Sequence, residues 1–202
     1  IGHPMSMDEP LAKILDGTFD SKPYAEKFKA GQAKAMKEME ANKKFAAVAK
    51  PVMDAMKEKD YSKAVLECEK LYLSEPALEL KIDSYYAAAL AKINPEKAIQ
   101  AAKNAGEKSE DRLSAFLSAF ARKDNDMKIY EFTADCITKN IAKDPSDLNA
   151  YYMLANVYEL MNNNEKCIET LNKFLVVARE QKIPEENLKG IVNKIGKLSE
   201  VK

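Results

Sequence analysis

The sequence predicts an all-α fold built from about four helical hairpins, and three observations support this prediction. The composition favours helices, because Ala, Lys, Glu and Leu dominate and only 6 glycines occur among 202 residues. Runs of β-branched residues, which would indicate strands, are scarce. The third observation is a short pattern that recurs at predicted helix starts, in which a small residue precedes an aliphatic one.

The small residue of this pattern recurs at Ala64, Ala98, Ala134 and Cys167, at intervals of 34, 36 and 33 residues. Three copies are clear, and the copy at residues 132–136 is weaker: Tyr61-Ser62-Lys63-Ala64-Val65, Pro95-Glu96-Lys97-Ala98-Ile99, Asn164-Glu165-Lys166-Cys167-Ile168 and Phe132-Thr133-Ala134-Asp135-Cys136. A single hairpin cannot bury its apolar face, so hairpins that repeat at this interval are expected to stack on one another.

This pattern resembles the tetratricopeptide repeat, a helical hairpin of about 34 residues. The resemblance implies a right-handed superhelical solenoid whose first helices line a concave groove that takes extended peptides or helices. Small residues recur in the expected first helices as well, at Ala89, Ala121 and Ala155, where paired helices would approach closely. The unequal intervals indicate a divergent array.

The expected hairpins join residues 43–59 to 61–73, 78–93 to 95–105, 109–123 to 127–143, and 146–161 to 165–181. Pro51 predicts a kink inside the first of these helices. Asn94-Pro95 predicts a helix start, Gly106 predicts a helix end, and the run Asn162-Asn163-Asn164 is most simply a turn.

Capping helices are expected on both sides of the repeats, which span residues 43–182. The N-terminal cap is assigned to residues 21–42, with an apolar stripe at Tyr24, Phe28, Ala35 and Met39. The sequence leaves open whether this helix breaks near Asn42 or continues into the first repeat. The C-terminal cap is assigned to residues 183–202, with a stripe at Leu188, Ile191, Ile195 and Leu198.

Residues 1–20 form a tail outside the repeats. Within it Ile1-Gly2, an acidic stretch at Asp8-Glu9, and Leu11, Ile14 and Leu15 at helical spacing resemble the closing strand and helix of a thioredoxin-like domain. The resemblance implies that the tail is the remnant of a preceding redox-type domain. The alternative is added sequence followed by a disordered tail.

Charge and residue usage disfavour several functions. With 32 basic and 32 acidic side chains interleaved, no field favours nucleic acid, and no apolar stretch is long enough to span a bilayer. The only histidine is His3, and nucleotide-binding glycine motifs are missing, so we expect no enzyme, cofactor or metal. Cys68, Cys136 and Cys167 fall in expected second helices, where the alternatives are core packing or a reactive thiol.

The expected function is therefore non-catalytic binding of a protein, as a peptide or helical segment in the groove. Its candidate residues lie on the first helices: Asp83, Tyr86, Leu90, Ser118, Arg122, Asn149, Tyr152, Met153 and Asn156. Tyr85-Tyr86 and Tyr151-Tyr152 must each place one ring in the core, so burial of Tyr86 or Tyr152 is the alternative.

A second expected function is that of a structural or dimerising C-terminal appendage of a thioredoxin-like redox protein, which leaves a homo-oligomer open. The sequence does not fix a compartment. A soluble chain of this kind fits the cytoplasm or, if an exported precursor was trimmed, the periplasm.

Overall fold

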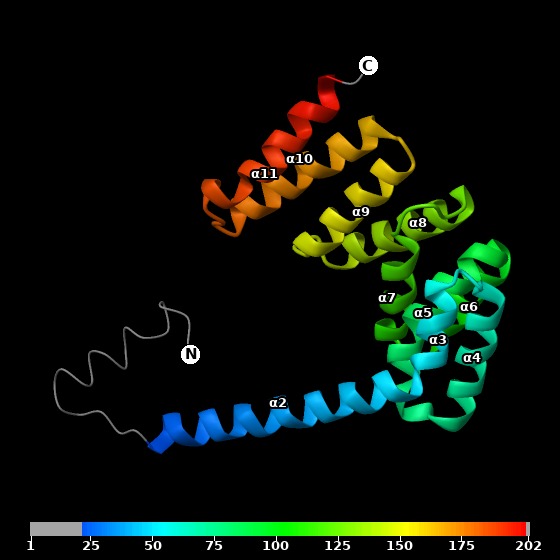
Figure 1. Ribbon diagram of the computed structural model, residues 1–202. Coiled ribbons are helices and arrows are strands. Elements are labelled where there is room, and N and C mark those ends of the chain that lie inside the picture. The colour runs from blue at the N-terminus through cyan, green and yellow to red at the C-terminus, as the bar shows by residue number, and fades with distance from the viewer. Residues whose placement is uncertain (1–21, 201–202) are drawn as a thin grey trace. The chain divides into compact units, whose positions relative to one another are not determined.

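The computed structural model describes residues 22–200, and every regular element in this range is a helix (Figure 1). The prediction of an all-α chain is confirmed for these residues. The chain divides into two units, Ile1–Val48 and Ala49–Lys202. The tail assigned to residues 1–20, with its thioredoxin-like resemblance, lies outside the described residues. No helix of the described part is long and apolar enough to cross a membrane.

The first unit contributes one described element, the helix α2 (Lys22–Val48). The sequence left open whether this helix breaks near Asn42, and in the structure it continues through Asn42 to Val48. The next helix, α3 (Lys50–Lys57), begins with Pro51 in its first turn. Proline is tolerated there because backbone N–H groups in the first turn of a helix have no hydrogen-bond partner within the helix. Pro51 therefore marks a helix start in place of the predicted kink.

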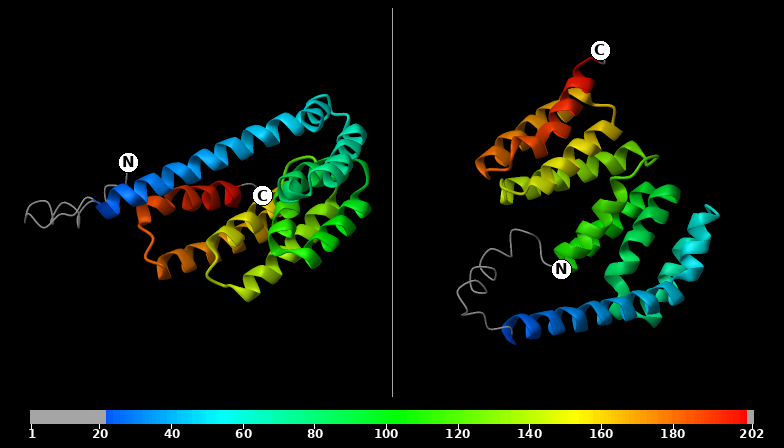
Figure 2. Two further views of the ribbon diagram at one scale, coloured as in Figure 1. Left: turned by 90° about the horizontal axis from the view of Figure 1, so that it is seen from below. Right: turned by 60° about the vertical axis from the view of Figure 1, so that its left-hand side comes forward.

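The second unit is a succession of helices at nearly the expected positions (Figure 2). After α3 these are α4 (Tyr61–Ser74), the short 3₁₀ helix η2 (Pro76–Leu78), α5 (Glu79–Ile93), α6 (Pro95–Lys108), α7 (Glu110–Phe120), α8 (Met127–Lys143), α9 (Leu148–Leu160), α10 (Asn164–Glu180) and α11 (Glu185–Glu200).

Side-chain caps set most of the helix starts in this unit. Asn94 accepts a hydrogen bond from the backbone N–H of Lys97 at 2.9 Å, which confirms the predicted start of α6. Asn162 has a left-handed φ of 54°, and Asn163 caps α10, so the asparagine run is a turn as predicted. Gly106 does not end α6, because the chain becomes extended only at Ser109, whose hydroxyl caps α7.

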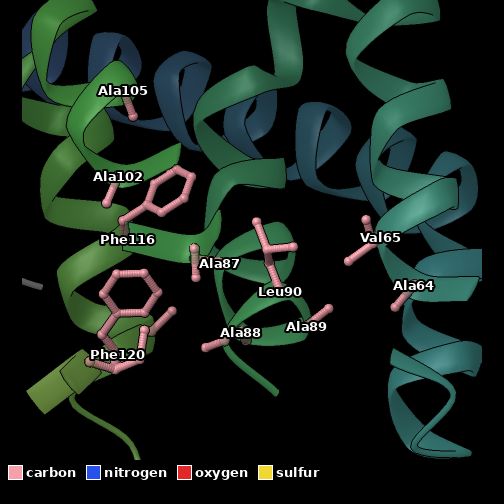
Figure 3. Close-up of a cluster of buried hydrophobic side chains, with 14 of the residues drawn as sticks. Ala64, Val65, Ala87, Ala88, Ala89, Leu90, Ala102, Ala105, Phe116 and Phe120 are labelled. Carbon is pink, nitrogen blue, oxygen red and sulfur yellow. The ribbon is translucent and has the colours of Figure 1, made fainter. Parts of the chain in front are cut away.

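The core of the second unit follows the chain from helix to helix. Extensive packing joins each helix to the next one or two in sequence: α3 to α4, α4 to α5, α5 to α6 and α7, α6 to α7, α8 to α9, α9 to α10 and α10 to α11. Small side chains occupy many of these contacts, and Ala64, Ala98 and Cys167 of the recurring pattern have no exposed surface. Figure 3 shows the largest cluster, in which alanines of α4, α5 and α6 surround Leu90, Phe116 and Phe120.

The third expected hairpin differs from the prediction. Helix α7 packs mainly on α5 and α6, and α8 packs mainly on α9, while direct contact between α7 and α8 is sparse. The connection between them is tied down locally. The Tyr130 hydroxyl donates to the Arg122 carbonyl at 2.8 Å, and the Asn125 side chain donates to the Phe120 carbonyl at 2.9 Å. These bonds fix the turn between the two helices, which still meet through side chains such as Phe120 and Phe132, with ring centroids 6.4 Å apart.

A buried ion pair joins α5 to α7. The Asp83 side chain has no exposed surface, and the Arg112 guanidinium donates to both of its oxygens at 2.7 Å, through Nε and Nη2. Arg112 Nη1 also donates to Glu79, and the Tyr72 hydroxyl of α4 donates to Asp83 at 2.7 Å. The hydrogen bonds to Asp83 are the main cause that raises the pKa of Arg112.

Replacing Ala98 with Leu should overfill the contact between successive helices. We expect Ala98→Leu to lower the free energy of unfolding by about 1 to 3 kcal/mol, measured by urea denaturation. Ala142→Leu is the matched control, because Ala142 is exposed on α8 and its replacement should stay within about 0.5 kcal/mol. Equal effects from the two variants would contradict close packing at Ala98.

Removing Arg112 should leave the Asp83 carboxylate buried without its charge partner. We expect Arg112→Ala to lower the free energy of unfolding by about 3 kcal/mol or more, again by urea denaturation. The control is Arg122→Ala, because that side chain is exposed and has no ion pair within residues 22–200. A loss in Arg112→Ala no larger than in Arg122→Ala would show that the network is not needed for stability.

Candidate interaction surface

Two of the nine predicted groove residues are not accessible. Asp83 and Leu90 both have 0% exposed surface, so neither can contact a partner in this structure. Asp83 is held by Tyr72 and Arg112, and Leu90 lies in the alanine-rich cluster of Figure 3. Their assignment to a groove is therefore wrong. The helical spacing placed both on α5 correctly, but α5 is covered by α4, α6 and α7 and has little free surface.

Tyr86 is half-buried and lies among residues of α4, α6 and α7. Its ring lies edge-on to Tyr72 of α4 and to Phe116 of α7, with centroids 5.4 and 6.4 Å away. It lines a cavity of about 260 Å³ together with Asn104 and Lys108 of α6. Burial, followed by the nearby Glu69 carboxylate, raises the pKa of the Tyr86 hydroxyl. Tyr86 therefore belongs to this cavity, apart from the other groove candidates.

Two of the candidates on α9, Tyr152 and Asn156, adjoin α11, whereas Met153 packs on the cluster of α7, α8 and α9 that includes Leu117. Asn149 and Tyr152 are exposed, and Met153 and Asn156 are half-buried. Lys194 of α11 donates to Asn156 Oδ1 at 3.1 Å and lies 5.9 Å from the centre of the Tyr152 ring. Sequence reasoning missed Lys194. The cap expected at residues 183–202 could have indicated it, because a C-terminal capping helix has to contact the first helix of the last hairpin.

The candidates Ser118 and Arg122 lie near and just beyond the C-terminal end of α7. Ser118 is exposed and follows Ser114 by four residues, which places both on one side of α7, while Arg122 is exposed in the turn after the helix ends at Phe120. Ser114 lines a cleft of about 620 Å³ between the start of α7 and the turn from α8 to α9. The cleft was not predicted from the sequence, because it exists only where α7 and α8 part.

The cleft carries more negative than positive side chains. Its walls include two lysines, Lys103 and Lys143, against five carboxylates: Glu107, Glu110, Asp111, Asp144 and Asp147. Three of these carboxylates have internal partners. Glu110 pairs with Lys143 at 3.2 Å, Asp147 caps α9, and two hydrogen bonds from Ser146 lower the pKa of Asp144. Glu107 and Asp111 have no side-chain partner within residues 22–200.

The exposed candidates thus fall into two groups, Ser118 on α7 with Arg122 in the turn after it, and Asn149 with Tyr152 on α9. On α7 the neighbouring Ser114 borders the acidic cleft, and on α9 the Tyr152 ring lies near Lys194. Helices α7 and α9 are not among the extensively packed pairs, so the surface of α7 that follows Ser114 is not covered by α9.

The described residues offer little for covalent or metal chemistry. Within residues 22–200 no three His, Cys, Asp or Glu side chains come close enough to hold a metal ion. Burial is the main cause that raises the pKa of the Cys68 thiol to about 12, and it also raises the pKa of Cys136 and Cys167. These thiols are protonated at neutral pH and are poor nucleophiles.

No protein-family model, curated protein or solved structure matches this chain.

The burial of the three cysteines predicts their order of reaction with a thiol reagent. In the folded chain at pH 8, Cys136 should react first because it is half-buried, while Cys68 and Cys167 have no exposed surface. Its rate should rise about tenfold per pH unit below its raised pKa, because only the thiolate reacts. Stopped-flow detection of the released chromophore measures this rate.

Two controls accompany the thiol experiment. All three cysteines should react together in concentrated urea, and Cys136→Ser should remove the early phase. Fast reaction of Cys68 or Cys167 in the folded chain would contradict their burial and would reopen a redox role.

Proposed function

We propose that this chain is a non-catalytic protein interaction module with a tetratricopeptide-like solenoid fold. In this proposal about four helical hairpins form a right-handed superhelix, closed at its C-terminal end by the capping helix α11. The supporting observation for the fold is that extensive packing joins only helices close in sequence, without a central core shared by distant segments.

Polar links between helices add support, because they join residues about one repeat apart. Lys92 donates to the backbone carbonyls of Lys123 and Asp124, which lie 31 and 32 positions later in the sequence. Arg112 and its partner Glu79 are 33 positions apart, and Lys194 and its partner Glu159 are 35 positions apart. A stack of similar hairpins places equivalent positions side by side, so contacts at one repeat length are expected of it.

The proposed binding surface is the exposed side of α7 with its acidic cleft, together with the exposed residues of α9. The single observation that carries the proposal is the accessible face of α7 at Ser114 and Ser118, which borders the cleft at Ser114. We infer that the ligand is a peptide or helical segment of a protein, and that the part seated in the cleft carries basic side chains. Exposed charges of this kind guide association and are screened by salt.

The second candidate function is a structural or dimerising appendage of a thioredoxin-like redox protein. The apolar side chains exposed on α2 favour the dimerising role over the purely structural one, because several exposed Phe and Met side chains along one helix are typical of contact surfaces. This function needs no ligand on α7 or α9.

Capture of a partner from an extract, with the full chain as bait, tests the proposed surface. We expect Arg122→Ala and Tyr152→Ala each to reduce the amount captured, by about tenfold where the residue is a binding hot spot. Arg179→Ala is the matched control, because Arg179 is exposed on α10 and pairs only with Glu185. Capture that neither Arg122→Ala nor Tyr152→Ala weakens more than Arg179→Ala would exclude this surface.

A further inference from the structure

Helix α2 exposes large apolar side chains along its length. The exposed fractions are 61% for Phe28, 65% for Met36 and 66% for Met39. A helix in a folded protein is stabilised mainly by packing of its apolar face, and α2 is 27 residues long, about 40 Å. A surface of this length has to be covered by a partner of similar shape for its apolar groups to leave water.

The residues of α2 follow a heptad pattern. Intervals of three and four residues alternate through Ala25, Phe28, Gln32, Ala35, Met39, Asn42 and Ala46, and all seven are exposed. In heptad terms these are successive a and d positions, and they form one seam along the helix. The alanines allow a second helix to approach closely, and Phe28 and Met39 supply the larger apolar contacts.

We propose that α2 forms a parallel two-stranded coiled coil with α2 of a second copy of this chain. The charges beside the seam favour this partner and this orientation. By their place in the sequence, Lys29 and Lys43 fall at e positions and Glu38 falls at a g position of the heptad. A parallel pair places Glu38 of one copy opposite Lys43 of the other, whereas an antiparallel pair brings the lysine-bearing edges together.

The polar residues in the seam also favour a second copy over a lipid surface. A basic amphipathic helix can lie on an anionic membrane, but that requires a broad apolar face. The seam of α2 is interrupted by Gln32 and Asn42. Polar residues at a or d positions are common in coiled coils, where they specify the register and the number of strands.

No ligand at α7 or α9 is needed for this dimer. The coiled coil rests on the dimerising candidate function and names the surface that forms the dimer. Its formation can therefore succeed or fail independently of the capture experiment with Arg122→Ala and Tyr152→Ala.

Sedimentation equilibrium of the full chain over a concentration series tests the dimer. We expect a monomer–dimer equilibrium in the unaltered chain, and Ala35→Glu should raise its dissociation constant at least ~100-fold because it buries two carboxylates in the seam. Ala30→Glu is the matched control, since Ala30 is equally exposed but lies on the outer side of the heptad. It should leave the dissociation constant unchanged.

A charge exchange tests the orientation. Glu38→Lys should weaken the dimer, because it would place Lys opposite Lys43 of the other copy. Adding Lys43→Glu to the same chain should restore the dissociation constant, because the opposite charges meet again in reverse order. Failure of the double variant to restore the dimer would overturn the parallel arrangement.

Three outcomes overturn the proposal. The first is a chain that stays monomeric over the whole series. The second is a dimer that Ala35→Glu and Ala30→Glu affect equally, because it would use another surface. The third is a monomer that binds vesicles containing phosphatidylserine and loses this binding in Ala35→Glu, which would assign the seam to a membrane.

Discussion

Close contact between helices that are neighbours in the chain is the constraint on which this structure depends. Neighbouring helices can approach each other closely only where the side chains between them are small. Because a protein interior is close-packed, larger side chains do not fit at these contacts. Ala55, Ala64, Ala98, Ala102 and Ala155 have no exposed surface, and Cys167 takes the same place in α10. Since each contact involves only the next one or two helices, the core extends along the chain and does not gather at a centre. The ends of such an arrangement stay apolar, and α11 covers one of them by packing Ile191, Ile195 and Leu198 on the cluster that includes Leu171.

The polar links act on this packing by fixing how far one helix can slide along another. Asp83 receives hydrogen bonds from Tyr72 of α4 and from Arg112 of α7, so three helices meet at one buried carboxylate. Moving α7 along α5 by one turn, about 5.4 Å, would leave the Asp83 carboxylate buried without its charge partner. The buried ion pair therefore opposes this movement.

The sequence predicted the helices of the second unit well because their signals are local. Asn94, Ser109 and Asp147 each cap the helix that follows them, and the apolar stripe of α11 packs as its spacing indicated. The errors arise where the outcome depends on distant residues. The residues around Pro51 do not indicate whether the proline kinks a helix or starts one. Gly106 stays helical because the chain becomes extended only at Ser109, and Gly106 itself lies close to Leu113, where a Cβ would come within 3.3 Å.

The candidate surface was harder to predict than the fold for the same reason. Helical spacing placed Tyr86 and Ser118 on first helices, but which side of a helix stays exposed depends on how many neighbours it has. Helix α5 has neighbours on several sides, so Asp83 and Leu90 are enclosed and Tyr86 is half-enclosed. Helix α7 is covered by α5 and α6 but parts from α8, so the Ser114 face stays open and the cleft forms beside it. The open face of α7 thus depends on how many helices cover it, which no local signal in the sequence shows.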